Sequence, residues 1–213
     1  HYIYTNGMVD PRDPEQTLAI TAGNENAIWL NTYGQRFTNE TGFDKTILGD
    51  LLNQDSTYYW AVFDESSRDV LSMRGREWIK NHEEGHPVLD DPNAAHKAES
   101  LQELASMTKL SPTALLSSVE RFNSLIDAGK DEDFDRFSSA GEAPPKIEQP
   151  PFYAIQFFPM PRKSMGGVAI DMQARALTAA GEVVPGLYAV GELTGSVGIN
   201  GTHGMDGMFL GPA

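Results

Sequence analysis

The feature that most constrains this chain is the glycine-rich stretch at its C-terminal end, residues 164–213. Two short apolar runs within it, Val168–Ile170 and Leu187–Val190, are bounded by glycines, a pattern typical of short buried strands. The glycines that follow are Gly191, Gly195, Gly198, Gly201, Gly204, Gly207 and Gly211. Because glycine reaches positive φ and lets a ligand approach the main chain closely, we expect a loop that wraps a flat or phosphorylated ligand.

Three motifs follow one another in this stretch. They are Gly166-Gly167 leading to Asp171; Gly181, Pro185-Gly186-Leu187-Tyr188-Ala189, Gly191-Glu192 and Gly195; and Gly204 to Gly211. Their spacing resembles the C-terminal part of the FAD domain in the fumarate reductase and succinate dehydrogenase flavoprotein family, which includes urocanate reductases and ketosteroid dehydrogenases. A generic hairpin accounts for the glycines but not for Pro-Gly-Leu-Tyr-Ala followed by Gly-Glu. The resemblance implies FAD as the cofactor.

A second region carries the same resemblance. Asn31, Gly34, Arg36, Phe37, Asn39 and Glu40 match N-x-x-G-x-R-F-x-N-E, which resembles the signature of the family's capping domain. We expect a hairpin here, with a strand over Ala27–Asn31 and a return strand over Arg36–Glu40; an ordinary hairpin with an Arg/Glu pair is the alternative. The run Gly129–Phe134 resembles the family's G-x-D-x-x-F.

The resemblance implies an α+β fold in two parts. Residues 1–163 would form a capping, or substrate, domain, and residues 164–213 the last strands of a Rossmann-like FAD-binding domain. The chain has no G-x-G-x-x-G, which in the family lies N-terminal to the cap. We therefore expect an internal piece of a longer flavoprotein that holds about half of an FAD site, with the N-terminal remainder of the FAD domain as its partner.

Local signals predict the other elements. Residues 1–26 are punctuated by glycine and proline and are expected to be loop-like, whereas residues 138–151 read as a proline-rich linker. A short helix over Thr46–Leu52, a buried strand over Tyr58–Phe63 and a helix capped by Asp64 follow from composition. Capping pairs and an amphipathic stripe predict helices in residues 100–127, from Ser100 with Glu103, Ser111 with Pro112, and Leu115, Val119, Phe122 and Ile126.

The resemblance also carries site residues over. Flavin contacts are implied for Gly166, Gly191, Glu192, Gly207, Met208, Phe209 and Leu210. The family's substrate site uses a histidine at the start of the cap, which His1 matches. Its acid arginine is replaced by a run that ends at Lys45, the histidine before Gly-Gly by Arg162 and Lys163, and the last arginine by His203. Fumarate itself is therefore doubtful as the substrate.

These residues support a function as an FAD-dependent oxidoreductase. Hydride would move across a C–C single or double bond of a small, anionic organic substrate bound by Arg162 and Lys163, with His203 or Lys45 as proton donor. A ketosteroid-dehydrogenase-like enzyme with an apolar substrate and a non-catalytic capping or binding module are the alternatives. The sequence does not identify the electron donor or acceptor.

One motif points to a different class. His82-Glu83-Glu84-Gly85-His86 matches the H-E-x-x-H of zinc hydrolases, which needs both histidines on one helix. Gly85 weakens a helix, and Pro87 turns His86 away from helical dihedrals. We therefore expect a polar surface loop and no metal.

Composition narrows the choice of partners. The net charge of −14 argues against nucleic acid or an anionic membrane as a partner, and no apolar run reaches the length of a membrane span. The absence of cysteine excludes disulfides, thiolate ligands and cysteine nucleophiles. It is compatible with either side of a membrane; a cytoplasmic location is our expectation and a periplasmic one the alternative.

Overall fold

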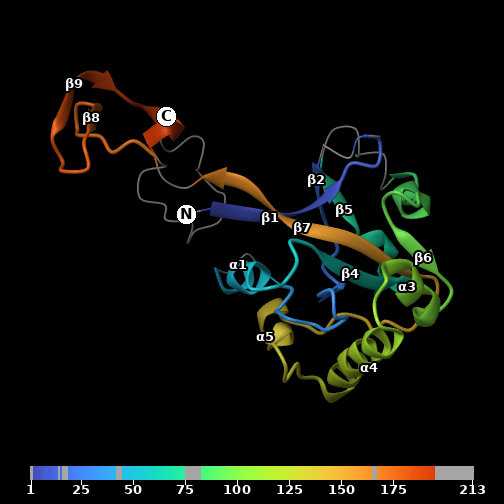
Figure 1. Ribbon diagram of the computed structural model, residues 1–213. Coiled ribbons are helices and arrows are strands. Elements are labelled where there is room, and N and C mark those ends of the chain that lie inside the picture. The colour runs from blue at the N-terminus through green and yellow to red at the C-terminus, as the bar shows by residue number, and fades with distance from the viewer. Residues whose placement is uncertain are drawn as a thin grey trace. The chain divides into compact units, whose positions relative to one another are not determined.

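The computed structural model describes residues 2–13, 15, 19–41, 45–74, 83–164 and 167–194 (Figure 1). The chain divides into two compact units, one of Thr5–Met160 and one that combines His1–Tyr4 with Pro161–Ala213. The strands are β1 (Tyr2–Val9), β2 (Ala19–Gly23), β3 (Ile28–Leu30), β4 (Tyr59–Asp64), β5 (Ser72–Arg74), β6 (His96–Ala98), β7 (Phe152–Ser164), β8 (Arg175–Leu177) and β9 (Val183–Tyr188). The α-helices are α1 (Lys45–Leu52), α3 (Leu101–Thr108), α4 (Pro112–Ala128) and α5 (Arg136–Ala140), and the 3-10 helices are η1 (Glu65–Val70), η3 (Pro87–Asp90) and η4 (Gly191–Thr194). No helix among these residues is long and apolar enough to cross a membrane.

A largely antiparallel sheet forms the framework of the first unit. Its strand order is β3-β4-β7-β1-β2-β5, and β6 pairs with β7 beside this path. The pairs β1–β2, β2–β5, β3–β4, β4–β7 and β6–β7 are antiparallel. The fold is therefore a mixed helix and sheet fold built on an antiparallel sheet.

Helices α3 and α4 bury one face of this sheet. The side chains alternate along the strands, so that Ile28 and Leu30 of β3 share a core with Trp60 and Val62 of β4 and with Ala154 of β7. From the helices, the core receives Leu104, Leu115, Val119, Phe122 and Leu125. The predicted stripe is thus confirmed, since its first three members are buried and Ile126 packs partly buried against the same core.

The helix ends follow the predicted capping signals. Ser100 Oγ accepts a hydrogen bond from Glu103 N at 3.2 Å at the start of α3, and Ser111 Oγ accepts one from Ala114 N at 3.4 Å at the start of α4. Gly129 ends α4 with φ 67°, the left-handed cap that glycine favours. Asp64 caps a 3-10 helix, η1, through Ser66 N.

The prediction of a loop over residues 1–26 is wrong, because β1 and β2 lie there. The sequence of β1, YIYTNGMV, is rich in aromatic and β-branched residues, and the glycine within it does not end the strand. A Cβ at Gly7 would lie 2.8 Å from Phe158 Cε2 and 3.1 Å from Met160 Cβ. This glycine therefore leaves room for side chains of β7, a role that glycine has inside strands.

The prediction of a return strand over Arg36–Glu40 is also wrong. Arg36 makes one isolated bridge with Leu30, and the described residues that follow it, up to Thr41, contain no strand. Instead, the Glu40 carboxylate accepts the Trp29 N–H of β3 at 3.3 Å, and the Asn39 side chain accepts Thr41 N at 2.9 Å. Side chains thus satisfy backbone groups that a second strand would have paired.

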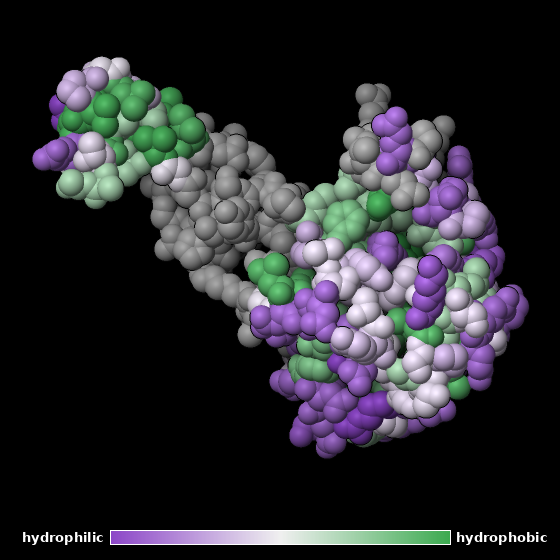
Figure 2. Space-filling model, viewed as in Figure 1, coloured by the Kyte–Doolittle hydropathy of each residue, from purple (hydrophilic) through white to green (hydrophobic). Residues whose placement is uncertain are grey.

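The second unit contains a hairpin, and its apolar runs are not buried strands. Ile170 makes only an isolated bridge with Ala176, and β8 and β9 pair antiparallel. The side chains of Leu187, Tyr188 and Val190 are 51%, 63% and 71% exposed. Figure 2 shows apolar surface over this hairpin. The prediction of burial is therefore wrong for these residues.

We predict that Gly34→Ala destabilises the fold more than Gly129→Ala does. Both glycines have positive φ, 78° and 67°, where an alanine costs about 1–2 kcal/mol. Only at Gly34 would the new Cβ also be crowded, at 3.1 Å from Ala114 Cβ, whereas no described atom lies within 4 Å at Gly129. Urea unfolding of both variants measures the difference, and equal losses would contradict the packing of this turn against α4.

Candidate functional site

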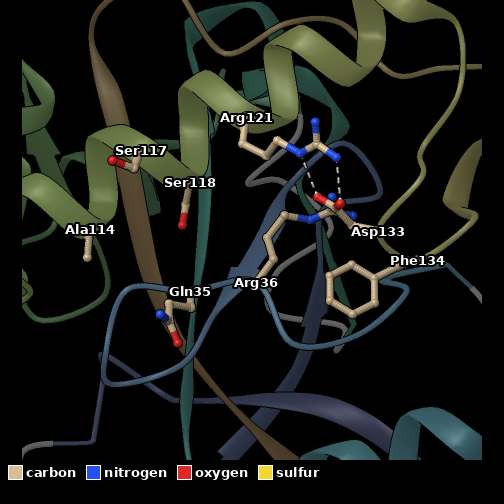
Figure 3. Close-up of a pocket in the computed structure, with 8 residues that line it drawn as sticks. All are labelled: Gln35, Arg36, Ala114, Ser117, Ser118, Arg121, Asp133 and Phe134. Carbon is tan, nitrogen blue, oxygen red and sulfur yellow. Dashed lines mark hydrogen bonds and ion pairs between the residues drawn. The ribbon is translucent and has the colours of Figure 1, made fainter.

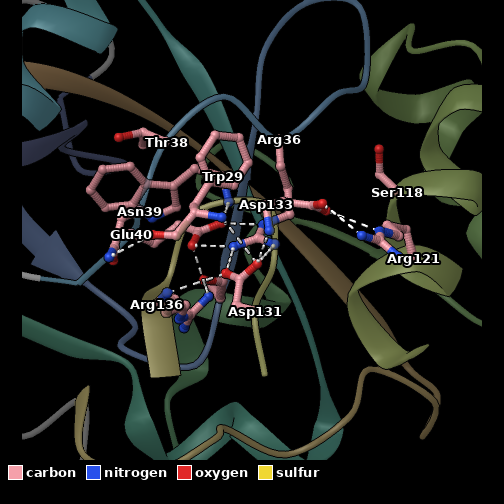
Figure 4. Close-up of polar contacts among 12 residues, drawn as sticks. Trp29, Arg36, Thr38, Asn39, Glu40, Ser118, Arg121, Asp131, Asp133 and Arg136 are labelled. Atoms are coloured by element: carbon pink, nitrogen blue, oxygen red, sulfur yellow. Dashed lines mark hydrogen bonds and ion pairs between the residues drawn. The ribbon is translucent and has the colours of Figure 1, made fainter. Parts of the chain in front are cut away.

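Two of the motifs noted in the sequence meet in a buried cluster of four charged residues (Figure 4). Arg36 and Glu40 come from the segment that follows β3, Asp131 from the turn after α4, and Arg136 from the start of α5. Their side chains are 5%, 1%, 0% and 1% exposed, respectively. We call these four residues the ion-pair quartet.

Arg36 is the centre of the quartet. Its Nε and Nη2 donate to the two oxygens of Glu40 at 2.8 and 2.9 Å, and Nη2 also donates to Asp131 Oδ2 at 2.9 Å. Arg136 Nη1 lies 3.2 Å from Glu40 Oε2. Two guanidinium groups thus face two carboxylates, so the buried charges balance, which is the condition under which ions are tolerated in a core.

Backbone and aromatic groups complete the cluster. Arg136 Nη1 and Nη2 donate to the carbonyls of Ala27 and Glu25 at 3.0 and 2.6 Å, which ties α5 to the turn before β3. The Arg36 guanidinium lies 4.9 and 5.1 Å from the ring centroids of Phe122 and Phe134. Within the described residues, Arg136 Nε is the one buried side-chain polar atom with no partner.

The charges in the quartet stabilise one another. Burial would raise the pKa of Asp131, but the hydrogen bonds and charge of Arg36 outweigh it and hold the pKa below its usual value. Burial likewise opposes the charged form of Arg36, yet Glu40 and Asp131 raise its pKa. Burial lowers the pKa of Arg136, and the neighbouring charge of Arg36 lowers it further, so that Glu40 does not outweigh them.

A shallow groove of about 390 Å³ lies beside the quartet (Figure 3). It runs between α4 and the segment after β3 and is lined by Gln35, Arg36, Ala114, Ser117, Ser118, Arg121, Asp133 and Phe134. On its wall, Arg121 forms a two-point ion pair with Asp133, at 3.1 and 2.7 Å. Because this cation already has a carboxylate partner, the groove does not offer a free charge to an anionic substrate.

The described part of residues 164–213 is the hairpin of β8 and β9 with the turns before and after it. Asp171 accepts hydrogen bonds from Gln173 N and Arg175 N at 3.0 and 2.9 Å, which orders the turn before β8. Gly191 follows β9 with φ 68°, and no described atom lies within 4 Å of the place a Cβ would take there. Among the described residues, the main chain at Gly191 is thus not crowded, and its positive φ is the conformation that favours glycine.

Most of the sequence-predicted site residues lie outside this description. His1, Gly166, His203, Gly207, Met208, Phe209 and Leu210 are outside the described residues. Of Lys45, Arg162, Lys163 and Glu192 the structure describes the backbone only: Lys45 begins α1, Arg162 and Lys163 lie near the end of β7, and Glu192 lies in η4. Their roles stay predictions.

The H-E-x-x-H run does not continue as one helix. Glu83 is helical, but Gly85 and His86 follow with φ 77° and 58°, in the left-handed region, and His82 lies outside the described residues. His86 is fully buried rather than part of a polar surface loop, so that part of the prediction is wrong. No group of metal-ligating side chains occurs in the part of the chain that the structure describes.

Sequence reasoning missed Arg136 and the joining of the two motifs. Arg136 stands in a charged stretch that reads as solvated surface, and nothing local marks it as buried. One signal was present in the sequence: the two motifs carry charges of opposite sign that can pair. Arg36 in the first motif and Asp131 in the second carry opposite charges, and each motif also holds a phenylalanine, Phe37 or Phe134.

The chain is similar to known proteins over most of its length. A family model described as "FAD binding domain" matches residues 5–210. The chain is 33% identical over 206 residues to a "Fumarate reductase (cytochrome)" of Shewanella frigidimarina, covering 97% of this chain and 33% of that protein. It is 33% identical over 174 residues to a "3-oxosteroid 1-dehydrogenase" of Mycolicibacterium smegmatis, covering 72% of this chain and 28% of that protein.

The fold has a counterpart among solved structures. The open conformation of a flavocytochrome c3 fumarate reductase superposes with a TM-score of 0.59 at 26% identity, covering 80% of this chain and 28% of that one. This chain thus spans a third or less of the length of these relatives.

We predict that Asp131→Asn destabilises the fold by about 3–5 kcal/mol, because it leaves the buried Arg36 with one carboxylate partner fewer. Asp133→Asn is the matched control, since it removes the carboxylate of an exposed ion pair two residues away. Urea unfolding should show a large loss for the first variant and nearly none for the second. Similar losses of unfolding free energy in both variants would show that the effect does not come from burial of the quartet.

The lowered pKa of Asp131 predicts a direction for acid sensitivity. A carboxyl whose pKa is depressed in the folded state contributes stability above its unfolded pKa, and that stability is lost as the pH falls through the folded pKa. We expect the unfolding free energy to fall below about pH 4. The pH dependence should be weaker in Asp131→Asn, as measured by urea unfolding between pH 7 and pH 3.

Proposed function

Because the chain belongs to the FAD binding domain family, we propose that it forms part of an FAD-dependent oxidoreductase acting on a C–C bond. The observation that carries this proposal is the family match over residues 5–210, which spans both units. When bound, FAD supplies or accepts the hydride. The residues of this chain hold the flavin, bind the substrate and move the proton.

The cofactor side of the proposal rests on the stretch that follows β9. Gly191 and Glu192 would hold the flavin, together with Gly166 and the run Gly207, Met208, Phe209 and Leu210. The left-handed main chain at Gly191, φ 68°, is compatible with this assignment, because glycine lets a ligand approach the backbone closely. A carboxylate at Glu192 can accept hydrogen bonds from the hydroxyls of a ribityl chain.

The substrate side assigns two kinds of role. Arg162 and Lys163 would bind a carboxylate of a small, anionic substrate, and His1 is a further candidate for the substrate site. In the reductive direction one alkene carbon receives the hydride, and the neighbouring carbon receives a proton from His203 or Lys45, so that the C=C bond becomes a saturated C–C bond. The reverse direction uses the same groups as bases.

A second substrate class has a specific observation behind it. The identity to the 3-oxosteroid 1-dehydrogenase equals that to the fumarate reductase, 33% in each case, although it covers less of this chain. An apolar ketone substrate is therefore the second candidate. The cationic pair Arg162 and Lys163 favours the anionic substrate over it.

The exposed apolar side chains of the hairpin support binding of another protein segment to the second unit. Leu187, Tyr188, Val190 and Leu193 together expose an apolar surface, with each side chain more than half accessible. Surfaces of this kind mark contacts with other protein. We propose that the N-terminal remainder of an FAD domain covers it, as part of a longer chain.

The first experiment is an absorbance spectrum of the full-length protein from the near-ultraviolet to the blue. We expect flavin bands that persist through gel filtration, followed by turnover of an enoate and not of a 3-oxosteroid with an artificial electron donor. A colourless protein that takes up no added FAD would contradict the proposal and leave a binding module. Turnover of the steroid alone would favour the second candidate.

We predict that Gly191→Ala weakens FAD binding about tenfold or more, whereas Gly186→Ala does not. Both glycines have positive φ, 68° and 79°, and open space where an added methyl group would stand, so that the backbone strain is matched. Only Gly191 is proposed to face the flavin. Fluorescence titration with FAD compares the two, and equal losses would mean that the hairpin, not the ligand, responds.

A further inference from the structure

Three side-chain hydrogen bonds join the segment after β3 to α1 and the turn that follows it. Thr38 Oγ1 donates to Asp50 Oδ2 at 2.7 Å, inside α1. Asn31 Nδ2 donates to Gln54 Oε1 at 3.2 Å, and Tyr33 OH donates to Asp55 Oδ2 at 2.5 Å. The segment of residues 31–38 therefore holds α1 in its C-terminal half, at Asp50, and beyond its C-terminal end.

These contacts matter because the described side chains of α1 give it few other anchors. It is eight residues long, well below the length at which a helix is stable alone in water. Of its described side chains, Ile47 and Leu51 are buried, at 2% and 4% exposure, and Leu52 is 69% exposed. Two apolar anchors hold a short helix against the core, but they leave its rotation and axial position to polar contacts.

The other end of the same segment is fixed by the ion-pair quartet. Thr38 lies between Arg36 and Glu40, and both of these bind across to groups nearly a hundred residues away. Thr38 itself is 1% exposed, so its hydroxyl points into the interior and not to solvent. The contact with Asp50 is thus a link between a rigid buried framework and a short helix.

We propose that Thr38 is a positioning residue that sets α1, and with it Lys45 at the first position of α1, relative to the quartet. The proposal rests on the function proposed above, in which Lys45 is a proton donor. Proton transfer requires the donor within hydrogen-bond reach of the reacting carbon, and a small displacement costs rate rather than binding. Asn31 acts in the same way, through Gln54.

The structural half of the proposal is tested on this chain alone by amide hydrogen exchange. Thr38→Val removes the hydroxyl at nearly constant volume, and we expect exchange at residues 49–53 to quicken about tenfold while the sheet is unchanged. Ser118→Ala is the matched control, because that hydroxyl donates to Gly34 O at 2.7 Å on the same segment but not to α1. Equal protection of α1 in Thr38→Val and wild type would overturn the proposal.

A second variant keeps the proposal testable if Thr38→Val does not fold. Asp50→Ala removes the acceptor of the Thr38 hydroxyl from the α1 side, at a partly exposed position. We expect faster exchange at residues 49–53 here too, by a smaller factor. Unchanged exchange in this variant, with Thr38→Val unfolded, would also count against the proposal.

The functional half is tested in the flavin-loaded, full-length protein with an enoate substrate. We expect Thr38→Val to lower kcat about tenfold with KM unchanged, and Thr38→Ser, which keeps the hydroxyl, to restore it. In a Lys45→Ala background, Thr38→Val should have less than about a twofold effect, because both changes act through one group. An undiminished effect in that background would overturn the link to Lys45.

Failure of the positioning role of Thr38 can be distinguished from failure of the proposed function. Full activity of Lys45→Ala would remove Lys45 from the proposed function, while the exchange experiment would still decide whether Thr38 positions α1. A protein without flavin would end the proposed function and leave the exchange result standing. Full activity of Thr38→Val, in a protein that depends on Lys45, would overturn the positioning role itself.

Discussion

The first unit depends on the burial of four charges that cancel one another. Removing two guanidinium groups and two carboxylates from water is costly, and only near-complete pairing offsets that cost. The contacts of Arg36 with Glu40 and Asp131 provide it. Because the partners come from three separate segments, the pairing is complete only when all three segments are in place. The segment after β3, the turn after α4 and the start of α5 therefore behave as one structural element.

In this arrangement, the buried charged residues of the family's motifs stabilise the fold, and other residues are proposed to act on ligands. Arg36 and Glu40 belong to a signature that the sequence associates with the cap, and the structure engages both with protein groups in the interior. Neither presents a free charge to a ligand. The residues proposed to act on substrate and flavin stand elsewhere, at the start of α1, near the end of β7 and after β9. When framework and substrate contacts are separate residues, the substrate contacts can change while the fold is kept.

Local signals predicted the helices well and the strands less well. Capping at Ser100 and Ser111 acts within one turn, so it can be read from neighbours in sequence. The conformation of Arg36–Glu40 depends on Asp131 and Arg136, which lie far along the chain and carry no local mark of burial. Gly7 misled for the same reason, since the side chains that need its space belong to β7. The flavin contacts were inferred from resemblance, and their positions beyond Thr194 lie outside the described residues.

The bond between Arg36 and Asp131 joins positions 95 residues apart in the chain. During synthesis, the N-terminal half of the unit leaves the ribosome with Arg36 and Glu40 already made and their other partners still missing. Those charges stay hydrated until α4 and α5 emerge, so the segment that holds α1 cannot settle early. The N-terminal half of the unit can therefore complete its folding only after the C-terminal half has been synthesised. A nascent chain interrupted before Asp131 would expose β3 and β4 without the cluster that closes over them.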